Sequence, residues 1–387
     1  MLDFSENVAR LEPSPTLAIT ARAKAMQAEG CSVIDLSAGE PSFSTPDVAA
    51  DGSSRAVAAG QTGYPPTPGI PELRSAVARY CNETTAESST EASNVLVSAG
   101  VKQVLFNLSY CLFGPGDEVL IPSPYWPTYL ATVDLSRATP VTVPLEWSDG
   151  FRLSVERLEA HRTERTKGIF LNSPSNPSGA VIAQGDLEEI LTWAGKHDVW
   201  VLSDEIYRRL YFGDGSAPSV LDIPDRPSRV VALDGMSKTF SMPGWRIGWG
   251  VGPADLMAKA AALQSQTTSG AAGPSQYASV ALLNSPERES IIEDFRNTLG
   301  RRRASSLAVL RQVASIEVHD QPGAIYHYLR LRAGQNSMDT AEALLTQAGV
   351  ATIPGEAFGT PGYLRITFAG ADAPLADGIR RIAEFFG

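Results

Sequence analysis

A regular alternation of strand-like and helix-like segments between residues 95 and 252 most strongly limits the fold of this chain. Seven short, β-branched runs recur there, and helical patterns such as residues 186–198 lie between them. The runs begin at Val95, Glu118, Pro140, Gly168, Val199, Arg229 and Arg246. Buried strands that alternate with helices are typical of a mainly parallel sheet covered on both faces. We therefore predict an α/β fold with a seven-stranded sheet, and ligand binding beyond the carboxyl ends of its strands.

The pattern changes after about residue 285, where a long helical stretch, residues 287–313, leads into a shorter region of mixed strands and helices. The chain has 387 residues, and single hydrophobic cores usually stop growing at roughly 250–300 residues. We predict a large domain over residues 45–285. Residues 1–44 should form an N-terminal arm and the first part of a smaller α+β domain, which residues 286–387 complete.

The charge balance limits the partners of the chain. It has 32 basic and 43 acidic residues, a formal net charge of −11, which argues against nucleic acid or an acidic membrane as a partner. An anionic ligand must therefore be held by a few local cations and helix ends. No apolar run is long enough to span a bilayer. Cys31, Cys81 and Cys111 form no CxxC pair, and the first residues lack the apolar core of a signal peptide, so we expect a cytoplasmic protein.

Five polar motifs carry the candidate chemistry, and four of them follow predicted strands. They are Ser98–Lys102, Asn172–Gly179, Ser203–Tyr207, Ser237–Arg246 and, near the C-terminus, Tyr363–Thr367. Each alone is weak, because an acidic or polar residue after a buried strand is commonly a turn or a helix cap. Their combination in this order is a much more specific signal. Four scattered histidines offer no metal-binding pattern.

This set of motifs resembles the fold-type I aminotransferases of class I/II, especially the bacterial aspartate aminotransferase subgroup. The similarity runs from about residue 10 to the C-terminus and includes LSAGEPSFSTP from Leu36, GYPPTPGIPELR from Gly63 and SPYWPTY from Ser123. The resemblance implies an enzyme dependent on pyridoxal 5′-phosphate, bound in the large domain. Such an enzyme transfers an amino group from an L-amino acid to a 2-oxo acid, such as 2-oxoglutarate, by a ping-pong mechanism. It also implies a homodimer with shared active sites.

The resemblance assigns the catalytic roles to three residues. Lys238 matches the lysine that carries the cofactor as a Schiff base, and such a lysine must be desolvated beside the cofactor. Asp204 matches the carboxylate that faces the pyridine nitrogen and keeps the ring protonated. Tyr207, together with Asn176, resembles the residues that donate hydrogen bonds to the phenolic oxygen. For Asn176 an ordinary turn role is the alternative.

Further matches concern the phosphate, the ring and the substrate. The phosphate is expected at the turn and helix start formed by Gly100, Val101 and Lys102, with contributions from Ser237, Arg246 and Tyr64 of the neighbouring subunit. Trp126 resembles the aromatic that stacks on the ring, although an ordinary core tryptophan is the alternative. Arg365 and the backbone of Gly39 match the groups that bind the substrate α-carboxylate, while Trp126 and Asn176 also face the substrate.

Substrate choice depends on Lys102 and Glu12. A lysine at position 102 reaches the distal carboxylate of dicarboxylic substrates in the subgroup, which favours aspartate or glutamate and leaves aromatic donors possible. The alternative is a lysine that merely solvates the helix end. Glu12 stands where a lysine is frequent and would disfavour an acidic side chain. Val101 and Pro243 also depart from the commonest pattern, which has glycine and threonine there.

The fold alone does not determine the reaction, because the same cofactor site supports several chemistries. One alternative is a pyridoxal-phosphate-dependent C–S lyase acting on a sulfur amino acid. Another is a non-catalytic domain that senses the cofactor, but the chain has no basic segment for an attached DNA-binding module.

Overall fold

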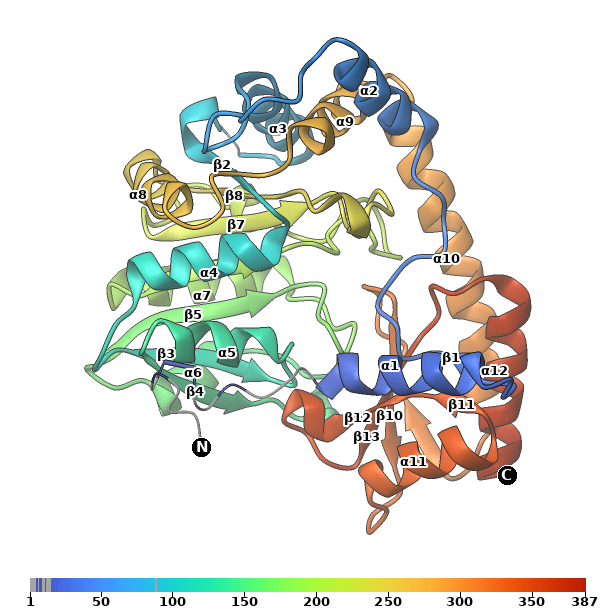
Figure 1. Ribbon diagram of the computed structural model, residues 1–387. Helices are drawn as coiled ribbons and strands as arrows, with labels where there is room; N and C mark the ends of the chain where they lie inside the picture. Colours follow the sequence, from blue (N-terminus) through green and yellow to red (C-terminus); the bar gives the residue numbers. More distant parts are fainter. Residues whose placement is uncertain (1–4, 6, 9–10, 12–14, 88) are drawn as a thin grey trace.

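The central element of the fold is a seven-stranded sheet with the strand order β2-β8-β7-β6-β5-β3-β4 (Figure 1). The computed structural model describes residues 5, 7–8, 11, 15–87 and 89–387. β8 is antiparallel to both of its neighbours, and all other neighbouring strands are parallel. The strands are Val95–Ser98 (β2), Glu118–Ser123 (β3), Thr139–Pro144 (β4), Thr166–Asn172 (β5), Trp200–Asp204 (β6), Val230–Gly235 (β7) and Gly248–Val251 (β8). The predicted mainly parallel sheet of seven strands is confirmed.

Successive side chains of each central strand enter different cores, because side chains alternate between the faces of a sheet. In β6, Leu202 packs into one hydrophobic cluster and Val201 into another. The first cluster includes side chains of α4 (Val101–Leu112), α5 (Thr128–Leu135) and α8 (Ala254–Ser265). The second includes side chains of α2 (Asp47–Ala58), α3 (Pro71–Thr84), α6 (Val155–His161), α7 (Gln184–Lys196) and α9 (Gly273–Leu283). Helices therefore cover both faces, as the sequence predicts.

A smaller α+β part lies below the long helix α10 (Arg288–Leu310) in Figure 1. Its antiparallel sheet has the order β12-β13-β10-β9. The strands are Ile316–Val318 (β9), Tyr326–Leu331 (β10), Ile353–Pro354 (β12) and Tyr363–Thr367 (β13); the accompanying helices are α1 (Pro15–Ala28), α11 (Ser337–Gln347) and α12 (Asp372–Phe386). β1 (Ile34–Asp35) pairs in parallel with β11 (Val350–Ala351). This pairing confirms that both ends of the chain build the smaller part, whereas the domain limits at residues 44 and 285 remain a prediction.

Short 3₁₀ helices complete the fold. They are Ala92–Asn94 (η1), Trp147–Asp149 (η2), Val220–Asp222 (η3), Pro243–Trp245 (η4) and Gly355–Phe358 (η5). Within the described ranges, no helix is long and apolar enough to cross a membrane.

A buried histidine joins the long helix to the smaller sheet. His327 in β10 is 4% exposed, and its Nε2 lies 2.7 Å from the hydroxyl of Ser306 in α10. Burial, with smaller contributions from Arg303 and Arg311, lowers the pKa of His327 to about 3. The folded protein therefore keeps this imidazole neutral at pH values where the unfolded chain, with a histidine pKa of about 6.5, binds a proton.

We expect His327 to make the protein less stable as the pH falls from about 7 to 5. Because the unfolded state binds the additional proton, the loss should be about 2 kcal/mol over this interval. A His327→Gln variant lacks this contribution, so its free energy of unfolding, measured by urea titration, should fall less between the two pH values. His161→Gln, which replaces a half-buried histidine in α6, is the control. Equal pH dependence in His327→Gln and the unaltered protein would show that His327 does not stay neutral.

Candidate active site

A cavity of about 520 Å³ lies where the carboxyl ends of the central strands meet the smaller sheet. It brings together most of the residues singled out in the sequence. Gly39, Val101, Lys102, Trp126, Asn176, Asp204, Tyr207, Ser237, Lys238, Arg246 and Arg365 all line it. Gly100 precedes α4 beside it, whereas Tyr64 lies outside its lining and is 97% exposed. Glu12 lies outside the described residues.

The start of α4 forms one end of the cavity. Gly100 has a φ of 85°, a backbone conformation that favours glycine, and a Cβ atom there would lie 2.6 Å from Nη2 of Arg246 and so displace that guanidinium. Arg246 donates from Nη1 to the carbonyl of Pro243 at 2.9 Å and from Nη2 to the carbonyl of Ala99 at 3.2 Å. The first N–H groups of a helix have no partner within the helix. Together with this guanidinium, they form a site suited to an anion.

Lys102 follows in the first turn of α4 and faces an aromatic ring. Its Nζ lies 5.1 Å from the ring centroid of Trp126, within the range of a cation–π interaction. The side chain keeps contact with solvent, but partial burial and the nearby Arg246 lower its pKa. Lys102 is therefore part of the cavity wall as well as of the helix surface.

Lys238 lies in the turn after β7, and its amine reaches across the cavity. Nζ donates a hydrogen bond to the carbonyl of Gly39. Burial is the main cause that lowers the pKa of Lys238, and Arg365 and Arg246 act in the same direction, against Tyr326 and Glu40. A lysine with a lowered pKa is more often neutral, and a neutral amine is the nucleophilic and basic form.

Asp204 is the last residue of β6 and is 2% exposed. The hydroxyl of Tyr129 donates to its Oδ2 at 2.8 Å, and the backbone N–H of Ile206 donates to Oδ1 at 3.2 Å. Burial raises the pKa of Asp204 to about 6, although both hydrogen bonds and the charge of Lys238 oppose the rise. The carboxylate is therefore ionised at neutral pH, and a cation placed beside it would be stabilised.

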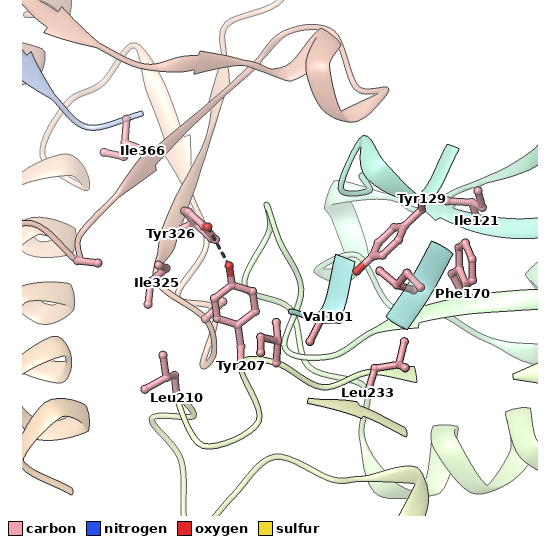
Figure 2. Close-up of a cluster of buried hydrophobic side chains, with 14 of the residues drawn as sticks. Val101, Ile121, Tyr129, Phe170, Tyr207, Leu210, Leu233, Ile325, Tyr326 and Ile366 are labelled. Carbon is pink, nitrogen blue, oxygen red and sulfur yellow. Dashed lines mark hydrogen bonds between the residues drawn. The ribbon is translucent and has the colours of Figure 1, made fainter. Parts of the chain in front are cut away.

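Two tyrosine hydroxyls meet at the boundary between the central sheet and the smaller sheet. The hydroxyls of Tyr207 and Tyr326 lie 2.9 Å apart, and Figure 2 shows this hydrogen bond with both rings. Burial is the main cause that raises the pKa of Tyr207, and the contact with Tyr326 adds to it. Tyr207 therefore stays protonated at neutral pH and can donate a hydrogen bond.

Arg365 projects from β13 and is 4% exposed. It donates from Nη1 to Oδ1 of Asn176 at 2.8 Å and from Nη2 to the carbonyl of Ser37 at 2.7 Å. The guanidinium also lies 4.3 Å from the ring centroid of Tyr326 and 5.0 Å from that of Phe358. Its Nε has no hydrogen-bond partner among the described residues. The planar guanidinium, held in this way, keeps its Nε–H as a donor for a carboxylate.

Sequence reasoning missed several side chains of the site. Tyr129, which Figure 2 shows beside Phe170, donates a hydrogen bond to Asp204. Its ring also packs edge to face on Trp126, with centroids 5.5 Å apart. Its place three residues after Trp126, in a motif already singled out, was the available signal. Asn172 donates to the carbonyl of Asp204 at 3.0 Å. Tyr326 carried no signal, because only the folding of β10 brings it beside Tyr207.

The cavity concentrates positive charge in an acidic protein. Four cationic side chains line it, Lys102, Lys238, Arg246 and Arg365, against the carboxylates of Asp204 and Glu40. The local cations and the helix start therefore offset the net charge of −11 and favour anionic ligands at this place.

The chain is similar to known aminotransferases over nearly its whole length. Residues 32–382 match the family described as aminotransferase class I and II. An aspartate aminotransferase from Streptomyces avermitilis is 39% identical over 394 residues, which cover 98% of this chain and 95% of that protein. A probable aspartate/prephenate aminotransferase from Aquifex aeolicus is 38% identical over 387 residues, 98% of each chain.

The fold agrees with these sequence relationships. The structure of aspartate aminotransferase from Thermus thermophilus with maleate has a TM-score of 0.95 and 33% sequence identity, and the match covers 99% of this chain and 100% of that chain. The family matches most of the chain, and the full-length relatives are well above 30% identical to it. Together these findings assign the chain to one family. This chain belongs to the class I and II aminotransferase family, and it is a transaminase with the fold-type I architecture.

Proposed function

We propose that this aminotransferase depends on pyridoxal 5′-phosphate and works by a ping-pong mechanism with an L-amino acid and a 2-oxo acid. The observation that carries the proposal is a single cavity lined by four side chains of complementary chemistry, Lys238, Asp204, Arg246 and Arg365. The amine of Lys238 suits an aldehyde, and the buried carboxylate of Asp204 suits a protonated ring nitrogen. The guanidinium of Arg246 suits a phosphate, and that of Arg365 suits a substrate carboxylate.

The residues of the cavity fit the cofactor at each of its groups. The helix start at Gly100, Val101 and Lys102, with Arg246 and the hydroxyl of Ser237, suits a phosphate. The ring of Trp126 suits a flat aromatic ring. When bound, pyridoxal phosphate draws electrons from the substrate Cα, so that the Cα–H bond can break.

The side chains around the ring prepare this chemistry. The ionised carboxylate of Asp204 keeps the ring nitrogen protonated. Tyr207 and Asn176, which also line the cavity, would donate hydrogen bonds to the phenolic oxygen. Lys238 would anchor the cofactor through Nζ, and the same amine, when free, would take up the proton that leaves the substrate Cα. The lowered pKa of Lys238 suits both roles.

Arg365 and Gly39 bind the α-carboxylate that both substrates carry. Asn176 and the carbonyl of Ser37 hold the two Nη groups of Arg365 in a fixed plane, so little side-chain entropy is lost when a carboxylate arrives. The unpaired Nε is the natural additional donor to this carboxylate.

Dicarboxylic amino acids, aspartate or glutamate, are the donors that Lys102 favours. Its charge at the cavity wall suits a second carboxylate. The names of the relatives, which include aspartate and aspartate/prephenate aminotransferases, support the same choice, as does the dicarboxylate maleate in the Thermus thermophilus structure. Aromatic donors remain compatible with Trp126. Glu12, outside the described residues, would act against an acidic side chain.

We also propose that the protein is a homodimer with shared active sites. We propose further that it works in the reducing environment of the cytoplasm. Tyr64 is almost fully exposed in the single chain, so its hydroxyl is available to the phosphate of a partner's site. Cys31, Cys81 and Cys111 are all free thiols, which suits a reducing compartment.

A half-reaction tests the proposed function. Aspartate or glutamate, added without an acceptor to the cofactor-loaded enzyme, should release its 2-oxo acid in an amount equal to the active sites. With both substrates, double-reciprocal plots should be parallel. Lys238→Ala should lower kcat by roughly 10⁵ or more, because it loses both the anchor and the proton carrier. Ammonia and pyruvate as products, or intersecting plots, would instead support a lyase or a sequential mechanism.

Lys102→Ala tests the substrate class. The variant should raise KM for the dicarboxylic donor about fivefold, the effect of a partly exposed charge pair, and leave aromatic donors within about twofold. Lys259→Ala, which removes an exposed lysine from α8, controls for the change of net charge. Equal effects of Lys102→Ala on both classes of donor would show that Lys102 does not contact the distal carboxylate.

Tyr129→Phe tests whether the hydroxyl of Tyr129 lowers the pKa of Asp204. The tyrosine hydroxyl favours the ionised carboxylate, so its removal should raise the pKa of Asp204 further above its usual range. The measurement is a pH titration of the Asp204 carboxyl carbon by NMR in the cofactor-free protein. Tyr125→Phe, which changes a tyrosine in a neighbouring cavity, is the control. An unchanged titration in Tyr129→Phe would contradict this role.

A further inference from the structure

The segment of residues 37–45, here called the connecting segment, joins β1 to α2 without regular secondary structure. Its first four residues, Ser37, Ala38, Gly39 and Glu40, line the active-site cavity. No strand or helix ladder holds these residues, so their position depends on individual contacts from the rest of the protein.

The loop after Lys238 supplies one group of these contacts. The hydroxyl of Ser241, which is 4% exposed, lies 2.9 Å from the carbonyl of Phe43 and 3.3 Å from the carbonyl of Pro41. It donates to this pair of neighbouring acceptors. Trp245 donates from Nε1 to Oγ1 of Thr45 at 2.9 Å. The cofactor-anchoring loop and the connecting segment are therefore joined at both positions.

Helix α10 and the smaller part hold the opposite side of the segment. The ring of Phe43 stacks on Phe295 with centroids 4.2 Å apart, and the guanidinium of Arg302 lies 5.3 Å from the ring of Phe43. Arg302 also donates to the hydroxyl of Ser42 at 3.0 Å, and the N–H of Ser42 donates to the carbonyl of Ala369. The segment is thus enclosed between two parts of the chain.

The backbone of Ser241 indicates that its hydroxyl has a role. Its φ is 52°, in the left-handed region that costs free energy for residues other than glycine. Glycine would adopt this conformation more easily but could not donate a hydrogen bond. Backbone strain of this kind persists where surrounding contacts enforce it and is concentrated at functional sites.

We propose that Ser241 is a positioning residue for the substrate α-carboxylate. Its hydroxyl fixes the connecting segment so that Gly39 stays in register with Arg365, whose Nη2 donates to Ser37 in the same segment. The hydrogen bond from Lys238 to the carbonyl of Gly39 is not available while Lys238 holds the cofactor, so the segment then depends on the remaining contacts. This inference rests on the proposed carboxylate-binding role of Gly39 and Arg365.

Ser241→Ala is the direct test, because alanine keeps the Cβ atom and the same backbone cost and removes only the hydroxyl. The amino donor and the 2-oxo acid acceptor both carry the α-carboxylate, so both KM values should rise by the same factor. The expected factor is about five- to tenfold, the effect of one lost hydrogen bond. The kcat should change by less than about twofold, and the dissociation constant of the cofactor, measured by fluorescence titration, should not change.

Thr239→Val is a matched control two residues away. The hydroxyl of Thr239 is buried and has no hydrogen-bond partner among the described residues, so its removal disturbs the same loop without releasing the connecting segment. Both KM values should stay near those of the unaltered protein.

Trp245→Phe is a second variant, which keeps an aromatic ring but loses the donor to Thr45. It should raise both KM values together. It replaces Ser241→Ala if that variant does not fold.

Several outcomes would overturn the proposal. Unchanged KM values in Ser241→Ala, or a change of KM for one substrate only, would contradict it. So would an equal rise of both KM values in Thr239→Val. A loss of cofactor affinity in Ser241→Ala would indicate a general loosening of the loop instead. Failure of the proposed function is a separate result, since the unaltered protein would then show no cofactor-dependent ping-pong kinetics with an amino donor and a 2-oxo acid.

Discussion

The hydrogen bonds of Arg365 join the parts of the chain on which the active site depends. This one buried guanidinium extends from the smaller sheet to Asn176, beyond a central strand, and to Ser37, in the segment that leads from β1 to α2. A buried charge is costly unless its donors are satisfied. The bond to Ser37 holds the guanidinium within the smaller part, and the bond to Asn176 requires this part to dock at the end of the central sheet. The cavity lies at that docking site.

Around this interaction, the protein arranges charges that would be unfavourable elsewhere. Lys238 is enclosed with Arg365 and Arg246 nearby, which lowers its pKa, while burial raises that of Asp204. The first shift leaves the Lys238 amine neutral more often, and the second makes the ionised form of the Asp204 carboxylate more dependent on a neighbouring cation. Both changes suit the proposed cofactor, which has a cationic ring nitrogen and an anionic phosphate.

The periodic parts of the fold could be read from the chain. All seven strand-like runs form strands of the central sheet, and the long helical stretch after residue 286 forms α10. The brief strands β1 and β11 could not be foreseen, since two residues carry no periodicity and their pairing joins positions more than 300 residues apart. Lys238, Asp204 and Arg246 could be recognised because each lies beside a strand in a distinctive motif. Tyr326 could not, because nothing near it in sequence reports its contact with Tyr207.

The sequence by itself determined the layered α/β fold, the family, and the side chains that carry charge into the cavity. These properties depend on local hydrophobic pattern and on residues close to strand ends, where neighbouring parallel strands necessarily meet. Only the tertiary structure decided which groups hold them in place. Tyr129 against Asp204, Tyr326 against Tyr207, and Ser241 against the connecting segment are contacts between elements far apart in the chain. Such contacts follow from the packing of complete sheets and helices, because hydrogen bonds form between atoms that are close in space, whatever their separation in sequence.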